Sequence, residues 1–190
     1  MKSYFYSIVL VAIIYSASCT SKNTEIKTEK QEVEGNDLNT YQGRVNEIEL
    51  YTKLMFDDSL NFNKLYAEKL LNAYDLFIKN DSYYNISKDY MFKAGELCRA
   101  LDKPHDAIKY FNLLIEKDPK HKLAGTALFY KAMIIGDYLQ ENELAIETYK
   151  EFIQKYPNHE LVESAKASIE LQGKTMEEII KGFKEKEKNV

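Results

Sequence analysis

The sequence predicts an all-α protein built from stacked helical hairpins, on three observations. Residues 90–119 align without a gap with residues 128–157, so one stretch recurs 38 residues further on. Apolar residues in both stretches recur at helical spacing, and each stretch ends in a proline. The chain of 190 residues has only seven glycines and three prolines, which suits long helices joined by short turns. A fixed period of roughly 20–50 residues is typical of a solenoid, in which each unit buries its apolar face against its neighbours.

The repetition predicts two equivalent hairpins, 83–100 with 104–117 and 122–138 with 142–155. Pro104 suits the first turn of its helix, because the missing N–H has no partner there in any case. The identical pairs include Lys93/Lys131, Ala94/Ala132, Ala107/Ala145, Ile108/Ile146, Ile115/Ile153, Lys117/Lys155, Pro119/Pro157, His121/His159 and Leu123/Leu161.

A degenerate copy of the hairpin precedes these two. Apolar residues at helical spacing predict a helix over 41–56, and Asp57-Asp58-Ser59 then supplies the cap of a second helix that carries Phe62 and Phe77. After the second repeat, Leu161–Leu171 would begin a further unit. The fold class is therefore about three repeats plus a closing helix pair, and the folded domain spans 41–188.

The closing helix has its own start signal. Gly173 stops the preceding helix, and Thr175 occupies the N-cap position with Glu178 at the capping-box position. Met176, Ile179, Ile180 and Phe183 lie on one side of this helix, and its other side is rich in lysine and glutamate. We expect that polar side to face solvent, as the end of a solenoid must.

The amino end has the pattern of an export signal. Lys2 precedes an apolar run from Tyr4 to Tyr15, followed by small residues, and this run is shorter than the roughly 20 residues of a membrane-spanning helix. We expect a signal peptide over 1–18. Residues 20–40 are polar and contain no aromatic residue before the domain begins, so we expect residues 19–40 to form a flexible tether.

Ser16-Ala17-Ser18-Cys19 resembles the lipobox of bacterial lipoproteins, with Ser16 where that family usually has an aliphatic residue. The resemblance implies that Cys19 is acylated and becomes the first residue of the mature protein. Thr20 follows the cysteine, and by resemblance to enterobacterial sorting this implies the outer membrane. The alternative is an ordinary secreted protein with an incidental cysteine.

The hairpins resemble tetratricopeptide repeats. That family has small residues at positions 7, 8 and 20, aromatic residues at positions 4 and 24, and proline at position 32. The matching residues are Ala94, Gly95, Ala107, Phe111 and Pro119 in the first repeat, and Phe129, Ala132, Ala145, Tyr149 and Pro157 in the second. Met133 departs from the small residue of the pattern and Gly136 from its tyrosine. The resemblance implies a right-handed TPR-type helical-hairpin solenoid.

The period of 38 residues is similar to that of TPR lipoproteins of the bacterial envelope, above all the small Bacteroidetes type. More distant resemblances are to the TPR lipoprotein of the outer-membrane barrel-assembly machine and to the Tol–Pal-associated division coordinator. The resemblance implies an outer-membrane lipoprotein facing the periplasm, with exposure at the cell surface left open.

Candidate chemical motifs have simpler explanations. His121 and His159 occupy the same position of the repeat, and His105 has no second ligand at helical spacing, so we expect no metal site. Gly173-Lys174-Thr175 lacks the upstream glycine of a phosphate-binding loop. Cys98 is expected to be a buried free thiol. We predict no catalytic residue and no cofactor, and the net charge of −4 with a pI near 5.5 gives no reason to expect nucleic acid.

What remains is a surface. In tetratricopeptide repeats the first helix of each hairpin lines a concave groove that holds peptides or helices of partner proteins. The resemblance assigns ten groove residues: Asp89, Phe92, Lys93, Glu96, Arg99, Tyr130, Lys131, Ile134, Asp137 and Tyr138. The alternative for Phe92, Tyr130 and Ile134 is that they only pack against the neighbouring helix.

The sequence thus predicts a lipid-anchored, non-catalytic adaptor that binds other envelope proteins or peptides. One alternative is an accessory subunit of outer-membrane protein assembly, although that lipoprotein normally has more repeats. Another is a homo-oligomeric structural protein of the envelope. It would need an apolar outer side on its last helix, whereas the sequence predicts a side rich in lysine and glutamate there. An enzyme would need a pocket of converging polar groups, which the repeats do not predict.

Overall fold

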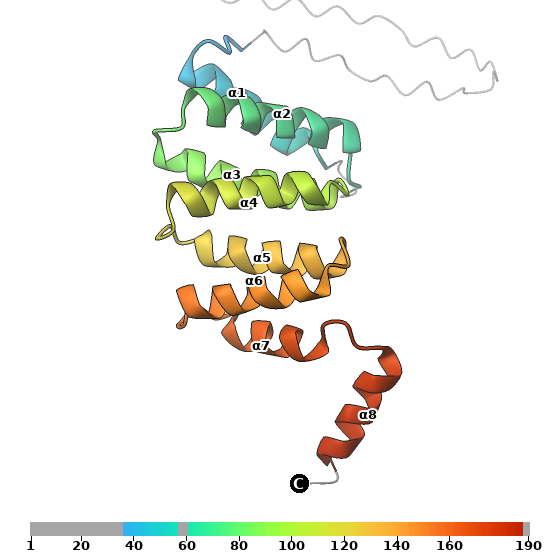
Figure 1. Ribbon diagram of the computed structural model, residues 1–190. Coiled ribbons are helices and arrows are strands. Elements are labelled where there is room, and N and C mark those ends of the chain that lie inside the picture. Colours follow the sequence, from blue (N-terminus) through green and yellow to red (C-terminus); the bar gives the residue numbers. More distant parts are fainter. Residues whose placement is uncertain (1–35, 57–60, 188–190) are drawn as a thin grey trace, which may run out of the picture. The chain divides into compact units, whose positions relative to one another are not determined.

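The computed structural model describes residues 36–56 and 61–187, and the predicted signal peptide, Cys19 and nearly all of the tether lie outside them (Figure 1). Within these ranges the regular secondary structure is α-helical, apart from one isolated bridge between Phe56 and Phe62. The helices are α1 (Tyr41–Leu54), α2 (Lys64–Asn80), α3 (Asn85–Ala100), α4 (Pro104–Lys117), α5 (Ala124–Asp137), α6 (Asn142–Lys155), α7 (Val162–Leu171) and α8 (Met176–Glu187).

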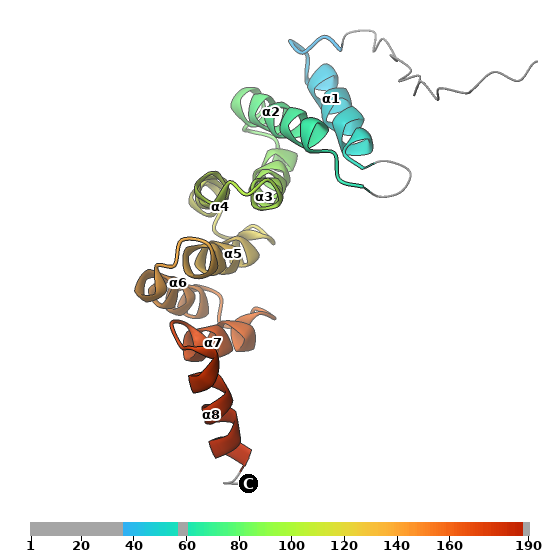
Figure 2. The same cartoon turned by 90° about the vertical axis from the view of Figure 1, so that its right-hand side faces the viewer.

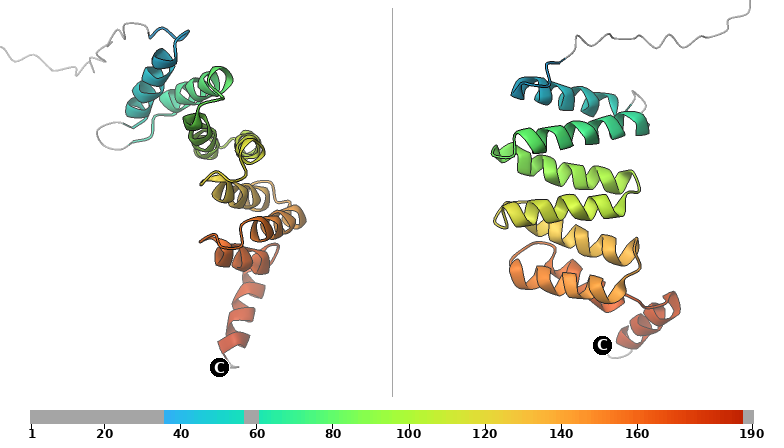
Figure 3. Two further views of the ribbon diagram at one scale, coloured as in Figure 1. Left: turned by 90° about the vertical axis from the view of Figure 1, so that its left-hand side faces the viewer. Right: turned by 45° about the horizontal axis from the view of Figure 1, so that its top comes forward.

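The helices from α1 to α7 form a stack of antiparallel neighbours. Seen along the helices, the odd-numbered ones lie on one side of the stack and the even-numbered ones on the other (Figures 2 and 3). Each helix packs against the next one along the chain from α1 to α7. The predicted all-α helical-hairpin solenoid is confirmed.

Small residues hold the helices of each hairpin close together. Ala94 and Ala107 have no exposed surface in the first repeat (α3 and α4), and Ala132 and Ala145 have none in the second (α5 and α6). A Cβ atom added at Gly95 would lie 2.5 Å from the ring of Phe111. The absence of a side chain at this position is therefore what admits the aromatic ring.

In the second half of the chain, the helix ends lie beside the residues that were predicted to start and stop the helices. α4 and α6 have the predicted bounds. Gly173 has a φ of 76°, where glycine is favoured, and the chain turns there after α7. The Thr175 N–H donates to a carboxylate oxygen of Glu178 at 2.8 Å, and the Glu178 N–H donates to the Thr175 hydroxyl at 3.3 Å. The predicted capping box is confirmed.

The ends of the first hairpin differ from the prediction. α2 begins only at Lys64, with Asn63 as its N-cap, so Phe62 precedes the helix rather than belonging to it. The Asn63 side chain accepts hydrogen bonds from the N–H groups of Leu65 and Tyr66, which explains why the helix starts there. Ser59, in the predicted cap, lies outside the described residues. α3, α5 and α7 each begin one or two residues later than predicted.

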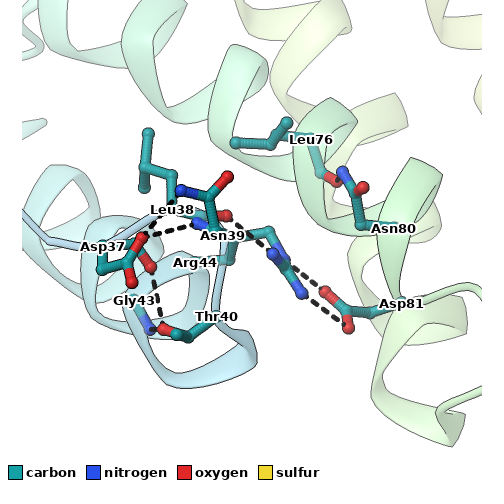
Figure 4. Close-up of polar contacts among 9 residues, drawn as sticks. All are labelled: Asp37, Leu38, Asn39, Thr40, Gly43, Arg44, Leu76, Asn80 and Asp81. Carbon is teal, nitrogen blue, oxygen red and sulfur yellow. Dashed lines mark hydrogen bonds and ion pairs between the residues drawn. The ribbon is translucent and has the colours of Figure 1, made fainter.

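A buried ion pair closes the first hairpin (Figure 4). The guanidinium of Arg44, on α1, donates to both carboxylate oxygens of Asp81, at 2.5 and 3.0 Å, and also to the carbonyl oxygen of Leu38. Arg44 is 8% exposed and Asp81 1% exposed. Because the pair joins α1 to the residue after α2, it fixes the degenerate hairpin that the repeat pattern specifies only weakly.

α8 is arranged differently from the other even-numbered helices. α4 and α6 lie alongside the helix before them, whereas α8 leads away from the stack (Figures 1 and 2). Met176 and Ile180 are exposed on it, at 69% and 46%. The predicted closing pair is therefore present as two helices, but its last member does not complete a fourth hairpin of the repeat type.

Candidate functional site

The ten predicted groove residues lie on α3 and α5 and at the C-terminal end of α5, on neighbouring odd-numbered helices of the stack. They divide into a buried and an accessible group. Phe92 is 7% exposed and Ile134 is fully buried, so these two belong to the packing, as the alternative interpretation held. Lys93, Glu96, Asp137 and Tyr138 are exposed, and the other four are half-buried.

Tyr130 links the two helices in the middle of this surface. Its ring stacks on that of Phe92, with centroids 5.9 Å apart, and packs against Phe111 at 6.0 Å. The guanidinium carbon of Arg99 lies 4.7 Å from the Tyr130 ring centroid, within the range of a cation–π interaction. Tyr130 is therefore both a packing residue and part of the accessible surface.

The guanidinium of Arg99 has an unused hydrogen-bond donor in this position. Its Nε atom is buried and has no hydrogen-bond partner among the described residues. Arg99, Ile134 and Tyr138 also line a narrow crevice at the end of α3, together with Lys103 and Pro104. Lys103 is not among the ten predicted groove residues, because it lies in the turn between α3 and α4 rather than at a helical groove position.

Charges alternate over the accessible part of the surface. The Nζ atom of Lys93 lies 5.7 Å from the ring centroid of Tyr90. Partial burial raises the pKa of the Glu96 carboxyl, and the positive charges of Arg99 and Lys93 oppose that rise. A surface with cations, carboxylates and aromatic rings side by side suits an extended or helical peptide that carries both apolar and charged side chains.

Asp89 has a structural role at the edge of this surface. Its carboxylate lies 3.3 Å from Nζ of Lys122 and 3.8 Å from Nε2 of His121, both in the turn between the repeats. The contact ties α3 to the start of α5. Asp89 is one of the ten predicted groove residues, and its carboxylate is used in these contacts within the protein.

The two repeated histidines have the same role in each turn. Nδ1 of His121 accepts the N–H of Leu123 at 3.3 Å, and Nδ1 of His159 accepts the N–H of Leu161 at 3.2 Å. Each bond satisfies a backbone donor just before α5 or α7. Repetition of the turn therefore accounts for both residues.

Other chemical groups are held inside the stack. Cys98 is fully buried, and burial raises the pKa of its thiol to about 12, so it is protonated at neutral pH. Across residues 36–56 and 61–187, no three His, Cys, Asp or Glu side chains come together as a metal site would require. Over the same ranges, the helices are too short or too polar to cross a membrane.

Two segments of the chain match the sequence model of the tetratricopeptide repeat, at residues 89–121 and 126–159. They coincide with the first and second repeats, so the two hairpins have the sequence pattern of tetratricopeptide repeats. A comparison with curated proteins found no match. The match suggests a scaffold for protein–protein interaction, because tetratricopeptide repeats generally bind partner proteins.

Proposed function

We propose that the protein is a non-catalytic, lipid-anchored scaffold of the bacterial cell envelope, and that it binds partner proteins through α3 and α5. The observation that carries the binding role is the arrangement around Tyr130. The repeat needs Phe92 and Ile134 for packing, but its packing does not use the exposed charges of Lys93 and Glu96. A tyrosine ring with an arginine against it is of the kind enriched at protein-binding surfaces, and the exposed charges of Lys93 and Glu96 would form a polar rim beside it.

The envelope role rests on the amino-terminal sequence. Lys2, the apolar run and Ser16-Ala17-Ser18-Cys19 together have the order of a lipoprotein signal. Acylation of Cys19 would attach the protein to a membrane, and residues 20–40 would let the repeats reach partners some distance from it. Thr20 after the cysteine favours the outer membrane, with the repeats facing the periplasm.

Charge reversal on the groove tests the binding role. We expect in-cell cross-linking of the full chain to recover envelope proteins, and Lys93→Glu with Lys131→Glu to lower that recovery about tenfold, as the loss of two interfacial charges predicts. Lys109→Glu with Lys150→Glu is the matched control, since these lysines are exposed on α4 and α6, on the other side of the stack. Equal loss in both pairs, or in neither, would count against the groove.

Metabolic labelling tests the anchor separately. A labelled fatty acid should enter the wild-type protein and not the Cys19→Ser variant, because the thiol is the acylated group. Cys98→Ser serves as the control, since its thiol is fully buried in the stack. Equal labelling of wild type and Cys19→Ser would contradict the lipoprotein assignment without affecting the groove.

A further inference from the structure

A cavity of about 630 Å³ lies at the C-terminal end of the stack, between α5, α6 and the turn that follows α7. Phe129, Met133 and Tyr149 give it an apolar wall. Asp137 and Asn142 line its rim. It is open to solvent. Of the ten predicted groove residues, only Asp137 lines it, so the cavity borders the proposed groove at one end and does not include Tyr130.

The internal repeat shows what occupies the same place one unit earlier. There, Ile134 and Tyr138 at the end of α5 lie against Arg99, Lys103 and Pro104. The residues 38 positions after Arg99 and Pro104 are Asp137 and Asn142, which line the cavity. The cavity is therefore the position in which the last turn of the next odd-numbered helix would lie.

α7 does not supply that turn. It ends at Leu171, and the position equivalent to Ile134 is Gln172, whose side-chain amide donates to Asn142 at 2.7 Å. Gly173 follows with a φ of 76° and turns the chain out of the stack. A helical turn with aliphatic side chains would thus fill the space that α7 leaves open.

Acidic residues at this end of the stack stand where the previous unit has basic ones, since Asp137 and Glu141 correspond to Arg99 and Lys103. Asp137 lines the cavity together with one cation, Lys174, and Glu141 and Glu143 flank the lining residue Asn142. These three acidic residues are exposed. A helix that docks here is therefore expected to carry positive charge beside its aliphatic residues.

α8 has both of these features. Met176 and Ile180 lie one helical turn apart and are exposed, and Lys184 follows one turn later and is also exposed.

We propose that the cavity binds α8 of a second copy of this chain. The chain's own α8 starts from the turn that forms the cavity wall and leads away from it (Figure 2). Its Ile179 side lies over α7, where it lines a gap with Leu171, so Met176 and Ile180 face outward. Each copy offers the helix that the other lacks, and a two-fold pairing satisfies both ends at once.

Photo-cross-linking of the full chain tests the pairing. A photoreactive amino acid at position 180 should cross-link to residues of the cavity wall such as Met133 and Asp137. In a mixture of isotope-labelled and unlabelled copies, the cross-linked peptides should be of mixed isotope composition. The same group at Lys150, exposed on α6, should give no cross-link to the cavity. Cross-links to another protein at position 180, or products within one copy only, would overturn the proposal.

Charge exchange gives a second and independent measurement. In detergent-solubilised full chain, Glu141→Lys and Lys184→Glu should each lower the dimer association constant about tenfold, and the double variant should restore it. Both residues are exposed, so the fold tolerates either change, which circular dichroism checks. A chain that sediments as a monomer at all concentrations, or single variants that dimerise like wild type, would overturn the pairing while leaving the proposed groove unaffected.

Discussion

The first repeat, α3 with α4, and the second, α5 with α6, agree at their helix crossings and differ at their surfaces. The alanines at the crossings, Ala94/Ala132 and Ala107/Ala145, have no exposed surface in either repeat. At the next residue of the odd-numbered helix, however, Gly95 corresponds to the half-buried Met133. The two repeats thus have the same small residues where the helix backbones approach each other, and they differ at the residue that follows.

The difference follows from what each repeat faces. The first repeat is followed by the whole of α5, whose Ile134 is buried in the same apolar cluster as Phe92 and Phe111. The second is followed by α7, which ends before the equivalent turn. Met133 therefore borders an open cavity, whereas Gly95 faces the ring of Phe111. The change in the free energy of unfolding on substitution at equivalent positions should therefore depend on the residues that each position faces. It should depend less on the residue type that the repeat pattern prefers there.

The largest difference is expected at Gly95 and Met133. Gly95→Met should lower the free energy of unfolding by about 3 kcal/mol, because its Cβ alone would lie 2.5 Å from Phe111. Met133→Ala, at the equivalent position, should cost only about 1 kcal/mol, since the side chain is half-buried beside a cavity. Urea denaturation measures both. Equal effects would show that the pattern, not the neighbour, sets the constraint.

A smaller difference is expected at the aromatic pair Phe111 and Tyr149. Phe111 is fully buried, so Phe111→Tyr should cost about 2 kcal/mol by burying a hydroxyl without a partner. Tyr149→Phe should cost about 1 kcal/mol, because it removes the interaction of the hydroxyl with Ser168, which opposes the rise that burial causes in the Tyr149 pKa. The same denaturation experiment applies. A stabilising Phe111→Tyr would mean that the first repeat has room that the structure does not show.

The smallest difference is in the response to alkaline pH. Burial raises the pKa of Cys98 from an ordinary 9.0 to about 12, and the equivalent position in the second repeat is Gly136. The folded state holds this proton more tightly than the unfolded chain does. Its stabilisation is therefore full below the unfolded pKa and is lost as pH rises above it. We expect the free energy of unfolding to fall by about 1 kcal/mol between about pH 8 and pH 10 from this residue.

Cys98→Ala checks that assignment, because the variant should lose stability less steeply over the same range. Tyr74 and Tyr110 contribute in the same direction at higher pH, since burial raises the pKa of both. The Tyr110 hydroxyl also donates to Asp75 at 2.6 Å, which favours its protonated form. An identical pH dependence in wild type and Cys98→Ala would contradict burial as the cause.

How well the sequence predicted each helix depends on how its ends are specified. α4 and α6 have the predicted bounds, because Pro104, Pro119 and Pro157 restrict the backbone by covalent geometry. α2 was predicted to include Phe62, and that was wrong. The cap is Asn63, and several polar residues before it could have served equally well in the sequence alone. The sequence predicted a helix end correctly only where one residue, such as a proline, could set it.

The ten groove residues were predicted from their positions in the repeat, and their exposure in the structure divides them into buried and accessible residues. Helical spacing alone places Phe92, Glu96 and Ile134 on the same side of their helices. Only the packing of α3 against α5 shows that Glu96 is exposed while Phe92 and Ile134 are buried. The partners of Arg44 and Tyr110 were likewise not predictable, because Asp81 and Asp75 lie 37 and 35 residues away in the sequence.

The sequence by itself determined the repeated hairpin, its period and its stop signals, since these depend on residue type and spacing within one helix or turn. Only the tertiary structure decided which of the repeated positions are exposed to solvent. Whether a side chain is exposed depends on the length and direction of the next helix, and α7, one turn short, leaves open a cavity where α5 leaves none. The same cause turns α8 away from the stack and exposes Met176 and Ile180.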